Sequence, residues 1–223
     1  MNLISRLLTR LFPNLVAIRS NFKRLAIDYG QWKSIREHMA VDTNGTPIPW
    51  YTYPAIEYLT SFDFRDCEVF EFGSGNSSIF WASRTRSVVS VENNRAWFEV
   101  VNKRKQQNQL VIHRADEDGY VKALSEQGKL YEIVVIDGNW RKPCTVEAIN
   151  CLKEDGMIVL DNSDRMIEKE CSSLLREKGF IQIDFSGFGP INGYCWTTSV
   201  FMKNPMFLQQ NFSGPTPIGG LGN

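Results

Sequence analysis

Short apolar runs alternate with amphipathic segments along the chain from residue 67 onward. The runs are almost continuously hydrophobic, which is typical of strands whose two faces are both covered by helices. The segments between them repeat their apolar positions every three or four residues, which indicates helices. The pattern predicts seven strands, at residues 67–72, 87–92, 109–114, 131–137, 156–162, 180–187 and 194–202. It predicts helices between the first six strands, at residues 77–85, 94–107, 118–128, 144–154 and 165–179.

The order of these elements predicts the architecture. Strands that are joined through helices make right-handed crossovers, so the first five strands should be parallel. The last two strands are joined by the loop GFGPING without a helix, so they should form an antiparallel hairpin at one edge. The predicted fold class is α/β, a Rossmann-like doubly wound, mostly parallel seven-stranded sheet with an antiparallel C-terminal hairpin edge.

The regular alternation covers only the middle of the chain, so three parts are predicted. Residues 1–49 are expected to form an amphipathic helical segment, and residues 50–203 the domain that contains the sheet. Residues 204–223 are rich in Gly, Pro and Asn and are expected to form a flexible tail.

The first 24 residues combine apolar periodicity with positive charge. They contain no acidic residue, and their basic residues are Arg6, Arg10, Arg19, Lys23 and Arg24. Apolar residues three or four apart give one stripe on a helix, formed by Leu3, Ile4, Leu7, Leu8 and Leu11. Two interpretations stay open. The helix packs on the domain or on a second subunit of a homo-oligomer, or residues 1–24 lie on a membrane surface with their basic side chains facing anionic lipid.

Composition narrows the class of protein. The 25 Lys and Arg residues balance the 25 Asp and Glu residues, so no overall field favours nucleic acid as a partner. The five cysteines form no CxxC pair, which argues against a disulfide framework or a zinc site and favours the reducing cytoplasm. No run of 18 apolar residues is present, so no transmembrane helix is expected, and any membrane contact would be peripheral.

The stretch FEFGSGNSS, residues 70–78, predicts a cofactor site. Gly73 and Gly75 follow the first strand, where missing side chains allow a sharp bend and the close approach of a ligand. The next helix begins with unpaired N–H groups that can bind polar groups of that ligand. Glu92 ends the second strand, 19 residues after Gly73, where a carboxylate can accept hydrogen bonds from both hydroxyls of a ribose. These residues predict a nucleotide-like cofactor.

Two residues distinguish between cofactors. Ser78 stands where the dinucleotide motif G-x-G-x-x-G has its third glycine, against which the pyrophosphate would lie. Glu71, two residues before Gly73, would repel a pyrophosphate but would attract a cationic amino group. The pattern therefore favours S-adenosylmethionine, with NAD(P) as the alternative.

The stretches VFEFGSGNSS, VVSVENN, YEIVVIDGNWR and LKEDGMIVLDNSDR together resemble the class I S-adenosylmethionine-dependent methyltransferases. The resemblance covers about residues 50 to 203. It implies that the acid and the glycine loop contact the methionine part of the cofactor, that the acid ending the second strand binds the ribose, and that an acid in the ADED loop contacts the adenine. These roles fall on Glu71, Gly73, Ser74, Gly75, Glu92 and Asp116.

Three oxygen-bearing side chains follow the fourth and fifth strands. Asp137 ends one strand, and Asp161 with Asn162 ends the other, so all three reach the same edge of the sheet. Such ligands suit a hard divalent cation such as Mg²⁺. The arrangement is similar to that of cation-dependent O-methyltransferases, which implies a metal that lowers the pKa of the substrate hydroxyl. The alternative is that Asp137 binds the substrate or a helix end while the other two shape a turn.

The segment after Asp137 departs from those enzymes. They place a lysine where this chain has Trp140. Arg141 is a candidate for clamping an anionic group of the substrate, and the alternative is a surface ion pair. We expect Asp137 and Arg141 to lie near the reacting groups.

Aromatic residues precede the sheet and follow it. Trp50, Tyr51 and Tyr53 either line the substrate pocket or pack in the core, and the loop at 187–196 is expected near the same edge. His38 and His113 have no partner pattern and are assigned to structure. The sequence therefore predicts an O-methyltransferase for a small molecule. Two alternatives remain, an NAD(P)-dependent oxidoreductase and a non-catalytic membrane-surface protein with this fold.

Overall fold

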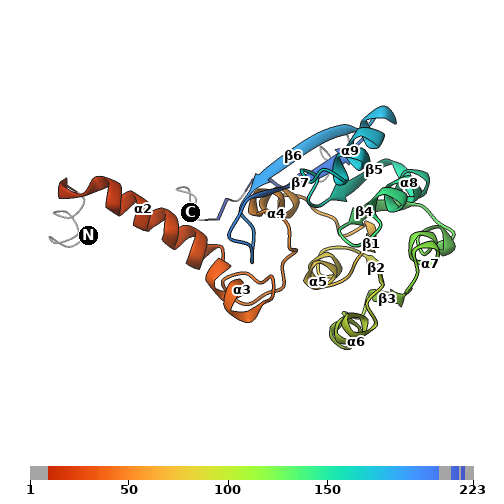
Figure 1. Ribbon diagram of the computed structural model, residues 1–223, viewed down its shortest axis with the longest axis horizontal. Helices are drawn as coiled ribbons and strands as arrows, with labels where there is room; N and C mark the ends of the chain where they lie inside the picture. The colour runs from red at the N-terminus through yellow and green to blue at the C-terminus, as the bar shows by residue number, and fades with distance from the viewer. Residues whose placement is uncertain (1–9, 206–211, 216, 219–223) are drawn as a thin grey trace.

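The structure of the protein is a computed structural model that describes residues 10–205, 212–215, 217 and 218. Its centre is a seven-stranded sheet in the order β3-β2-β1-β4-β5-β7-β6 (Figure 1). The strands are β1 Glu68–Phe72, β2 Ser87–Glu92, β3 Gln109–His113, β4 Tyr131–Ile136, β5 Leu152–Leu160, β6 Ile181–Gly187 and β7 Trp196–Met202. The first five strands pair in parallel, and β7 runs antiparallel to both β5 and β6. The predicted fold class is confirmed.

The strand order reverses between β1 and β4. The chain moves outward from β1 through β2 to β3 and then returns to place β4 on the other side of β1. In sheets of this kind, ligands bind beyond the carboxyl ends of the strands, where the order reverses. Phe72 and Ile136 are paired at these ends, so the loops that begin at Gly73 and Asp137 leave the sheet side by side.

Helices connect the strands and cover both faces of the sheet. They are α2 Pro13–Lys23, α3 Gln31–Glu37, α4 Tyr53–Thr60, α5 Asn76–Ala82, α6 Arg95–Arg104, α7 Glu117–Lys122, α8 Arg141–Cys151 and α9 Glu168–Glu177, with the π-helix η1 Arg24–Asp28 and the 3₁₀-helix η2 Ser125–Gln127. The helix predicted at 144–154 ends three residues early, because Leu152 already pairs with Tyr131 in the sheet. Within β5, Gly156 lies where a larger residue would not fit, because a Cβ there would lie 2.8 Å from the carbonyl oxygen of Glu132.

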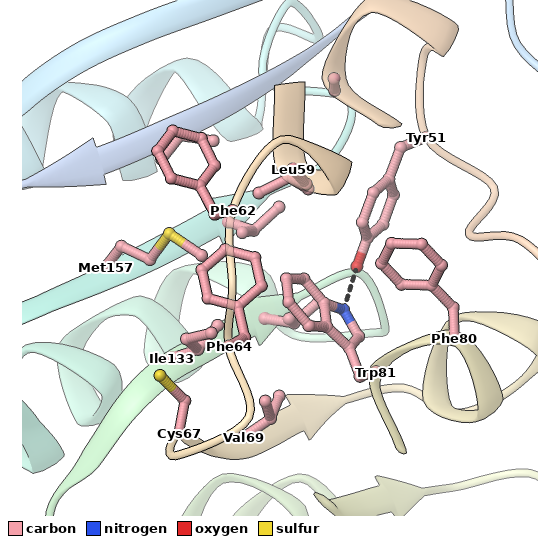
Figure 2. Packing of buried hydrophobic residues seen from close by; sticks show 14 of the residues in the cluster. Tyr51, Leu59, Phe62, Phe64, Cys67, Val69, Phe80, Trp81, Ile133 and Met157 are labelled. Carbon is pink, nitrogen blue, oxygen red and sulfur yellow. Dashed lines mark hydrogen bonds between the residues drawn. The ribbon is translucent and has the colours of Figure 1, made fainter. Parts of the chain in front are cut away.

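Alternate residues of the central strands face two separate core layers. Val69, Ile133 and Met157 pack on one face, together with Leu59 of α4 and Trp81 of α5 (Figure 2). The opposite layer joins the other strand positions to α7, α8 and α9, and includes Phe70, Phe72, Val134, Ile158, Tyr120, Ala148 and Leu175. Both faces are buried, which explains why the strand sequences are apolar throughout.

Two of the aromatic residues before the sheet belong to the first of these layers. Tyr51 and Tyr53 are buried, and the indole Nε1 of Trp81 donates a hydrogen bond of 3.4 Å to the hydroxyl of Tyr51 (Figure 2). Trp50 is 43% exposed and lies outside this layer.

The segment before residue 50 is helical where it is described. Figure 1 shows α2, in red, projecting from the rest of the molecule, and none of its eleven residues is buried. The next helix, α3, is fastened to the hairpin loop, since Gln31 Nε2 donates to the carbonyl oxygens of Gly189 (2.9 Å) and Asn192 (3.3 Å). Within the described residues, no helix is both long and apolar enough to cross a bilayer.

Part of the chain after residue 203 lies against α4. Phe212 forms an isolated antiparallel bridge with Phe62, and the N–H of Ser213 donates to the carbonyl oxygen of Ser61 at 2.7 Å. Residues 1–9 of the predicted amphipathic helix, and residues 206–211, 216 and 219–223 of the predicted tail, lie outside the described residues. The predicted domain boundaries and the flexibility of the tail stay predictions.

Candidate active site

Two cavities lie beyond the carboxyl ends of the central strands. One, of about 490 Å³, is lined by Gly73, Glu92, Tyr120 and Trp140 among others, and we call it the Glu92 cavity. The other, of about 470 Å³, is lined by aromatic residues and is called the Trp50 cavity. Both volumes are typical of small-molecule sites. The two cavities share four lining residues, Ser74, Asp137, Arg141 and Arg165.

The glycine loop makes the turn that its sequence predicts. Gly73 has a φ of +105°, a conformation that side chains strongly disfavour. A Cβ at Gly73 would also lie 3.2 Å from the backbone nitrogen of Gly138 in the neighbouring strand-end loop. A Cβ at Gly75 would meet only the ring of Trp97, at 3.8 Å. Gly73 is therefore required by the backbone, whereas Gly75 keeps the mouth of the loop open.

Buried hydroxyl groups hold the loop from below. The N–H of Gly75 donates to Ser78 Oγ at 3.0 Å, and Ser78 Oγ in turn donates to Glu71 Oε2. Ser90 Oγ donates to the same carboxylate oxygen at 3.0 Å. Ser78, which replaces the third glycine of the dinucleotide motif, is fully buried and its hydroxyl is committed to this network.

Glu71 supports the loop but lines neither cavity. It is only 1% exposed, and its second oxygen, Oε1, has no hydrogen-bond partner among the described residues. Burial raises the pKa of Glu71 to about 7, although the hydroxyl donors oppose the shift. A direct contact between Glu71 and the methionine part of the cofactor stays a prediction.

Glu92 lies where the sequence predicted a ribose-binding acid. It lines the Glu92 cavity, and its carboxylate accepts hydrogen bonds from Ser74 Oγ at 3.0 Å and from the N–H of Asn94 at 2.9 Å. These two donors fix the orientation of the carboxylate in the cavity wall. Tyr120 lines the same cavity, and its hydroxyl is buried and has no hydrogen-bond partner among the described residues. A buried hydroxyl without a partner suits a site that a polar ligand completes.

Asp116 is not brought to either cavity. Its side chain caps α7, where Oδ1 accepts a hydrogen bond of 2.9 Å from the N–H of Gly119. The cap lowers the pKa of Asp116, because the backbone N–H stabilises the ionised form. The structure thus gives Asp116 a local role at the helix terminus, and its proposed contact with adenine stays a prediction.

The three candidate metal ligands do meet, but they meet around the side chain of Arg141. Its Nη2 lies 3.3 Å from Asp137 Oδ1 and 3.2 Å from Asn162 Oδ1, and its Nη1 donates to the carbonyl oxygen of Asp161. Nε donates to the carbonyl oxygen of Gly138 at 3.0 Å. The side chain of Arg141 is 9% exposed, so it is not a surface ion pair. Its contact with an anionic group of a substrate stays a prediction.

The carboxylate of Asp161 forms hydrogen bonds with side chains of β7 and not with Arg141. Its Oδ1 accepts hydrogen bonds from Thr198 Oγ1 at 2.6 Å and from Trp196 Nε1 at 3.0 Å. Burial raises the pKa of Asp161 to about 6, and the Thr198 hydroxyl partly opposes the shift. Burial, followed by the charge of Asp161, raises the pKa of Asp137 well above its usual range, and the charge of Arg141 acts in the opposite direction.

These residues do not fit a divalent cation. A permanent positive charge already stands against Asp137 and Asn162, and a second cation there would be repelled by it. Across the described ranges, no group of three or more His, Cys, Asp and Glu side chains could hold a metal ion. Arg141 therefore occupies the position in which the sequence suggested magnesium.

The Trp50 cavity takes its walls from parts of the chain that are far apart in sequence. Trp50, Tyr194 and Trp196 supply aromatic surface, so Trp50 lines a cavity rather than the core, and the loop at 187–196 lies at this edge of the sheet. Whether a substrate binds there stays a prediction. His38, which the sequence assigned to structure, also lines this cavity, together with Met39 and Ala40. Asn76 Nδ2 at the start of α5 donates to the carbonyl oxygen of Ala40 at 2.7 Å, so this wall is fastened to the glycine loop.

Arg165 borders both cavities, and sequence analysis missed it. Its side chain is exposed and makes no hydrogen bond or ion pair that involves the rest of the described chain. Tyr120 was missed as well, because it lies on the buried side of α7 like an ordinary core residue. Ser78, by contrast, could be recognised from the sequence, since it stands at the third glycine position of a known motif.

Comparison with known proteins supports the fold. No protein-family model matches this sequence, and no curated protein matches it. Among solved structures, precorrin-6y C5,15-methyltransferase from Geobacter metallireducens is similar, with a TM-score of 0.54 and 13% identity over 68% of this chain and 87% of that one. A protein from Klebsiella pneumoniae to which an O-methyltransferase activity is ascribed has a TM-score of 0.52 and 15% identity over 66% of this chain and 75% of that one. The resemblance seen in the sequence is thus confirmed for the fold: the chain has the fold of the class I S-adenosylmethionine-dependent methyltransferases.

Proposed function

We propose that the protein is an S-adenosylmethionine-dependent methyltransferase that methylates a hydroxyl group of a small molecule. The observation that supports this is the meeting of the two cavities at Asp137. One cavity has the features of a nucleoside site, the other is aromatic, and the carboxylate that borders both can act on a group passed between them. Group transfer needs such an arrangement, because the donor and the acceptor must be held in line.

The residues of the Glu92 cavity fit the proposed cofactor. Glu92 offers a fixed carboxylate for the ribose hydroxyls, Tyr120 offers an unpaired hydroxyl, and Gly73 brings the backbone close. S-adenosylmethionine, when bound, supplies a methyl group on a sulfonium centre. NAD(P) fits less well, because Ser78 and the carboxylate behind it stand where a dinucleotide motif has a glycine near the pyrophosphate.

Asp137 is the candidate proton acceptor. It borders both cavities, and burial and the charge of Asp161 raise its pKa, which makes the ionised carboxylate a stronger proton acceptor. Arg141 is a positioning residue, since its guanidinium holds Asp137, Asn162 and the backbone of Asp161 in one arrangement. In this arrangement Asp137 can accept the proton of an acceptor hydroxyl as the methyl group is transferred.

The Trp50 cavity indicates the kind of acceptor. Trp50 and Tyr194 offer flat apolar surface, and Arg165 adds a positive charge that no described carboxylate neutralises directly. An acceptor with an aromatic body, a hydroxyl group and an anionic group matches these three features.

Calorimetry tests the cofactor. S-adenosylmethionine and S-adenosylhomocysteine should bind to the wild-type chain, and NAD should not. Glu92→Ala should weaken binding by roughly tenfold or more, because the ribose loses a charged acceptor. Glu99→Ala is the matched control, since Glu99 pairs with Arg95 on the exposed side of α6. Binding of NAD in place of S-adenosylmethionine, or equal affinity of the two variants, would overturn the proposal.

Turnover tests the chemistry. With methyl-labelled S-adenosylmethionine and a panel of aromatic hydroxy acids, label should pass to a hydroxyl oxygen, and Asp137→Asn should reduce the rate by about 10²-fold or more. Chelation of divalent cations should leave the rate unchanged, because Arg141 occupies the candidate metal position. A rate that depends on Mg²⁺ would contradict that role of Arg141.

A further inference from the structure

The helix α2 carries an apolar face that the described chain leaves uncovered. Leu15, Ile18 and Phe22 follow at intervals of three and four residues, so they share one side of the helix. They are 63%, 64% and 64% exposed. A continuous apolar surface of this kind indicates a binding surface, because water contact with it is unfavourable.

The charge of the same segment has one sign. Every charged residue from position 10 to position 27 is basic, although acids and bases balance over the whole chain. Arg24 pairs with Asp28 at 2.7 Å. Arg10, Arg19 and Lys23 have no acidic partner within the described part of the chain. The segment therefore presents an uncompensated positive charge beside its apolar face.

The apolar face and the basic residues lie next to each other on α2, as binding to an anionic bilayer requires. At 100° per residue, Arg19 and Lys23 lie about 40° and 80° around the helix from Leu15, so they border the apolar face. Apolar side chains of such a helix can enter the boundary of the acyl chains while the flanking basic side chains meet phosphate headgroups.

A second copy of this chain matches the surface less well. Two α2 helices packed face to face would bring Arg19 and Lys23 of one copy close to the same residues of the other, and like charges at short range repel. An anionic lipid surface complements the apolar face and the charge together. We propose that α2 docks the protein on the surface of an anionic membrane, with Leu15, Ile18 and Phe22 facing the bilayer.

Vesicle co-sedimentation of the full chain, without any cofactor, tests this proposal independently of methyl transfer. The protein should sediment with vesicles of phosphatidylcholine and phosphatidylglycerol, and much less with phosphatidylcholine alone. Ile18→Asp should lower the partition coefficient by about tenfold or more, because a charge is forced into the boundary of the acyl chains. Arg19→Glu with Lys23→Glu should also lower it by about tenfold or more, and added salt should weaken wild-type binding.

Matched variants separate docking from general effects. Ile181→Asp changes an isoleucine on the edge strand β6 that is 51% exposed, and Lys103→Glu with Lys105→Glu makes the same change in net charge on α6. Both controls should bind vesicles like the wild type. The two α2 variants should melt at the temperature of the wild type, because α2 has no buried residue.

Three outcomes would overturn the proposal. One is the absence of vesicle binding, and another is equal binding to neutral and anionic vesicles. The third is a stable dimer, seen by light scattering, that Ile18→Asp converts to a monomer. That result would assign the apolar face to a second copy.

Discussion

Glu71 and Asp137 are acids at the ends of adjacent strands, yet the protein uses them differently. Glu71 points into the molecule, accepts hydrogen bonds from Ser78 and Ser90, and lines neither the Glu92 cavity nor the Trp50 cavity. Asp137 borders both cavities and is held by the guanidinium of Arg141. The comparison shows that an acid at a strand end is a weak indicator by itself. Its neighbours decide whether it supports the backbone or faces a ligand.

The largest effect is expected from replacing Arg141, whose guanidinium lies beside Asp137. Arg141→Met should lower the free energy of unfolding by about 3–5 kcal/mol, since it leaves oxygens of the half-buried Asp137 and of the buried Asp161 and Asn162 without their donor. Urea unfolding measures the change.

A surface arginine provides the control for this test. Arg95→Met removes an exposed ion pair with Glu99 and should cost less than about 1 kcal/mol. If the two variants lost equal stability, Arg141 would not organise the Asp137 end of the site.

The pH dependence of stability tests the Glu71 end. The pKa of Glu71 is raised from 4.5 to about 7 in the folded protein, so the folded state binds this proton more tightly than the unfolded chain does. Its stabilising effect is complete below pH 4.5 and is lost as the pH rises through about 7. Glu71→Gln should match the wild type near pH 4 and exceed it above pH 7, by up to about 3 kcal/mol.

Urea unfolding at several pH values measures this difference. Asp161 and Asp137 also have raised pKa values and contribute a slope of the same sign, so only the difference between the wild type and Glu71→Gln reports on Glu71. Parallel stability curves for the two proteins would show that folding does not raise the pKa of Glu71.

Loss of the hydrogen bond from Thr198 to Asp161 should have a smaller effect on the free energy of unfolding. Thr198→Val removes the hydroxyl that donates to Asp161 and accepts from the N–H of Thr52. The loss should be about 2 kcal/mol in urea unfolding. Thr197→Val is the neighbouring control, because the Thr197 hydroxyl makes only an exposed contact with Ser186 and its loss should cost about 0.5 kcal/mol. A control as costly as Thr198→Val would point to strand packing rather than to Asp161.

The smallest effect on the free energy of unfolding is expected from removing the Ser78 hydroxyl, which supports the glycine loop. Ser78→Ala removes one donor from Glu71 and the acceptor of the Gly75 N–H, and should cost about 1 kcal/mol. Ser83→Ala, at the exposed end of the same helix, should have almost no effect on urea unfolding. If Ser78→Ala leaves stability unchanged while cofactor affinity falls, the hydroxyl acts on the ligand and not on the loop.

The sequence predicted those parts of the site that depend on position along a strand. Gly73, Glu92 and Asp137 follow apolar runs, and parallel strands bring their ends to one edge. The approach of Asp137 to Asn162 was predicted for the same reason, and the structure confirms that Arg141 contacts both.

What stayed hidden depends on side-chain direction and on long-range docking. Arg141 begins α8, and only the turn before it, where Trp140 has a φ of +49°, directs its guanidinium back toward Asp137. His38 reaches the Trp50 cavity because α3 is fastened to the hairpin loop through Gln31, a contact that spans more than 150 residues. Asp116 had a local explanation as a helix cap, in the spacing of an acid three residues before a glycine N–H.

The attachment of Ala40 to Asn76 has a practical consequence for anyone who shortens this chain. A fragment that starts near Trp50 would keep the sheet, Gly73 and Glu92, and would still present the Glu92 cavity. It would lack His38, Met39 and Ala40, which line one side of the Trp50 cavity. Compounds selected against such a fragment would be matched to an open trough and not to the cavity that the longer chain encloses.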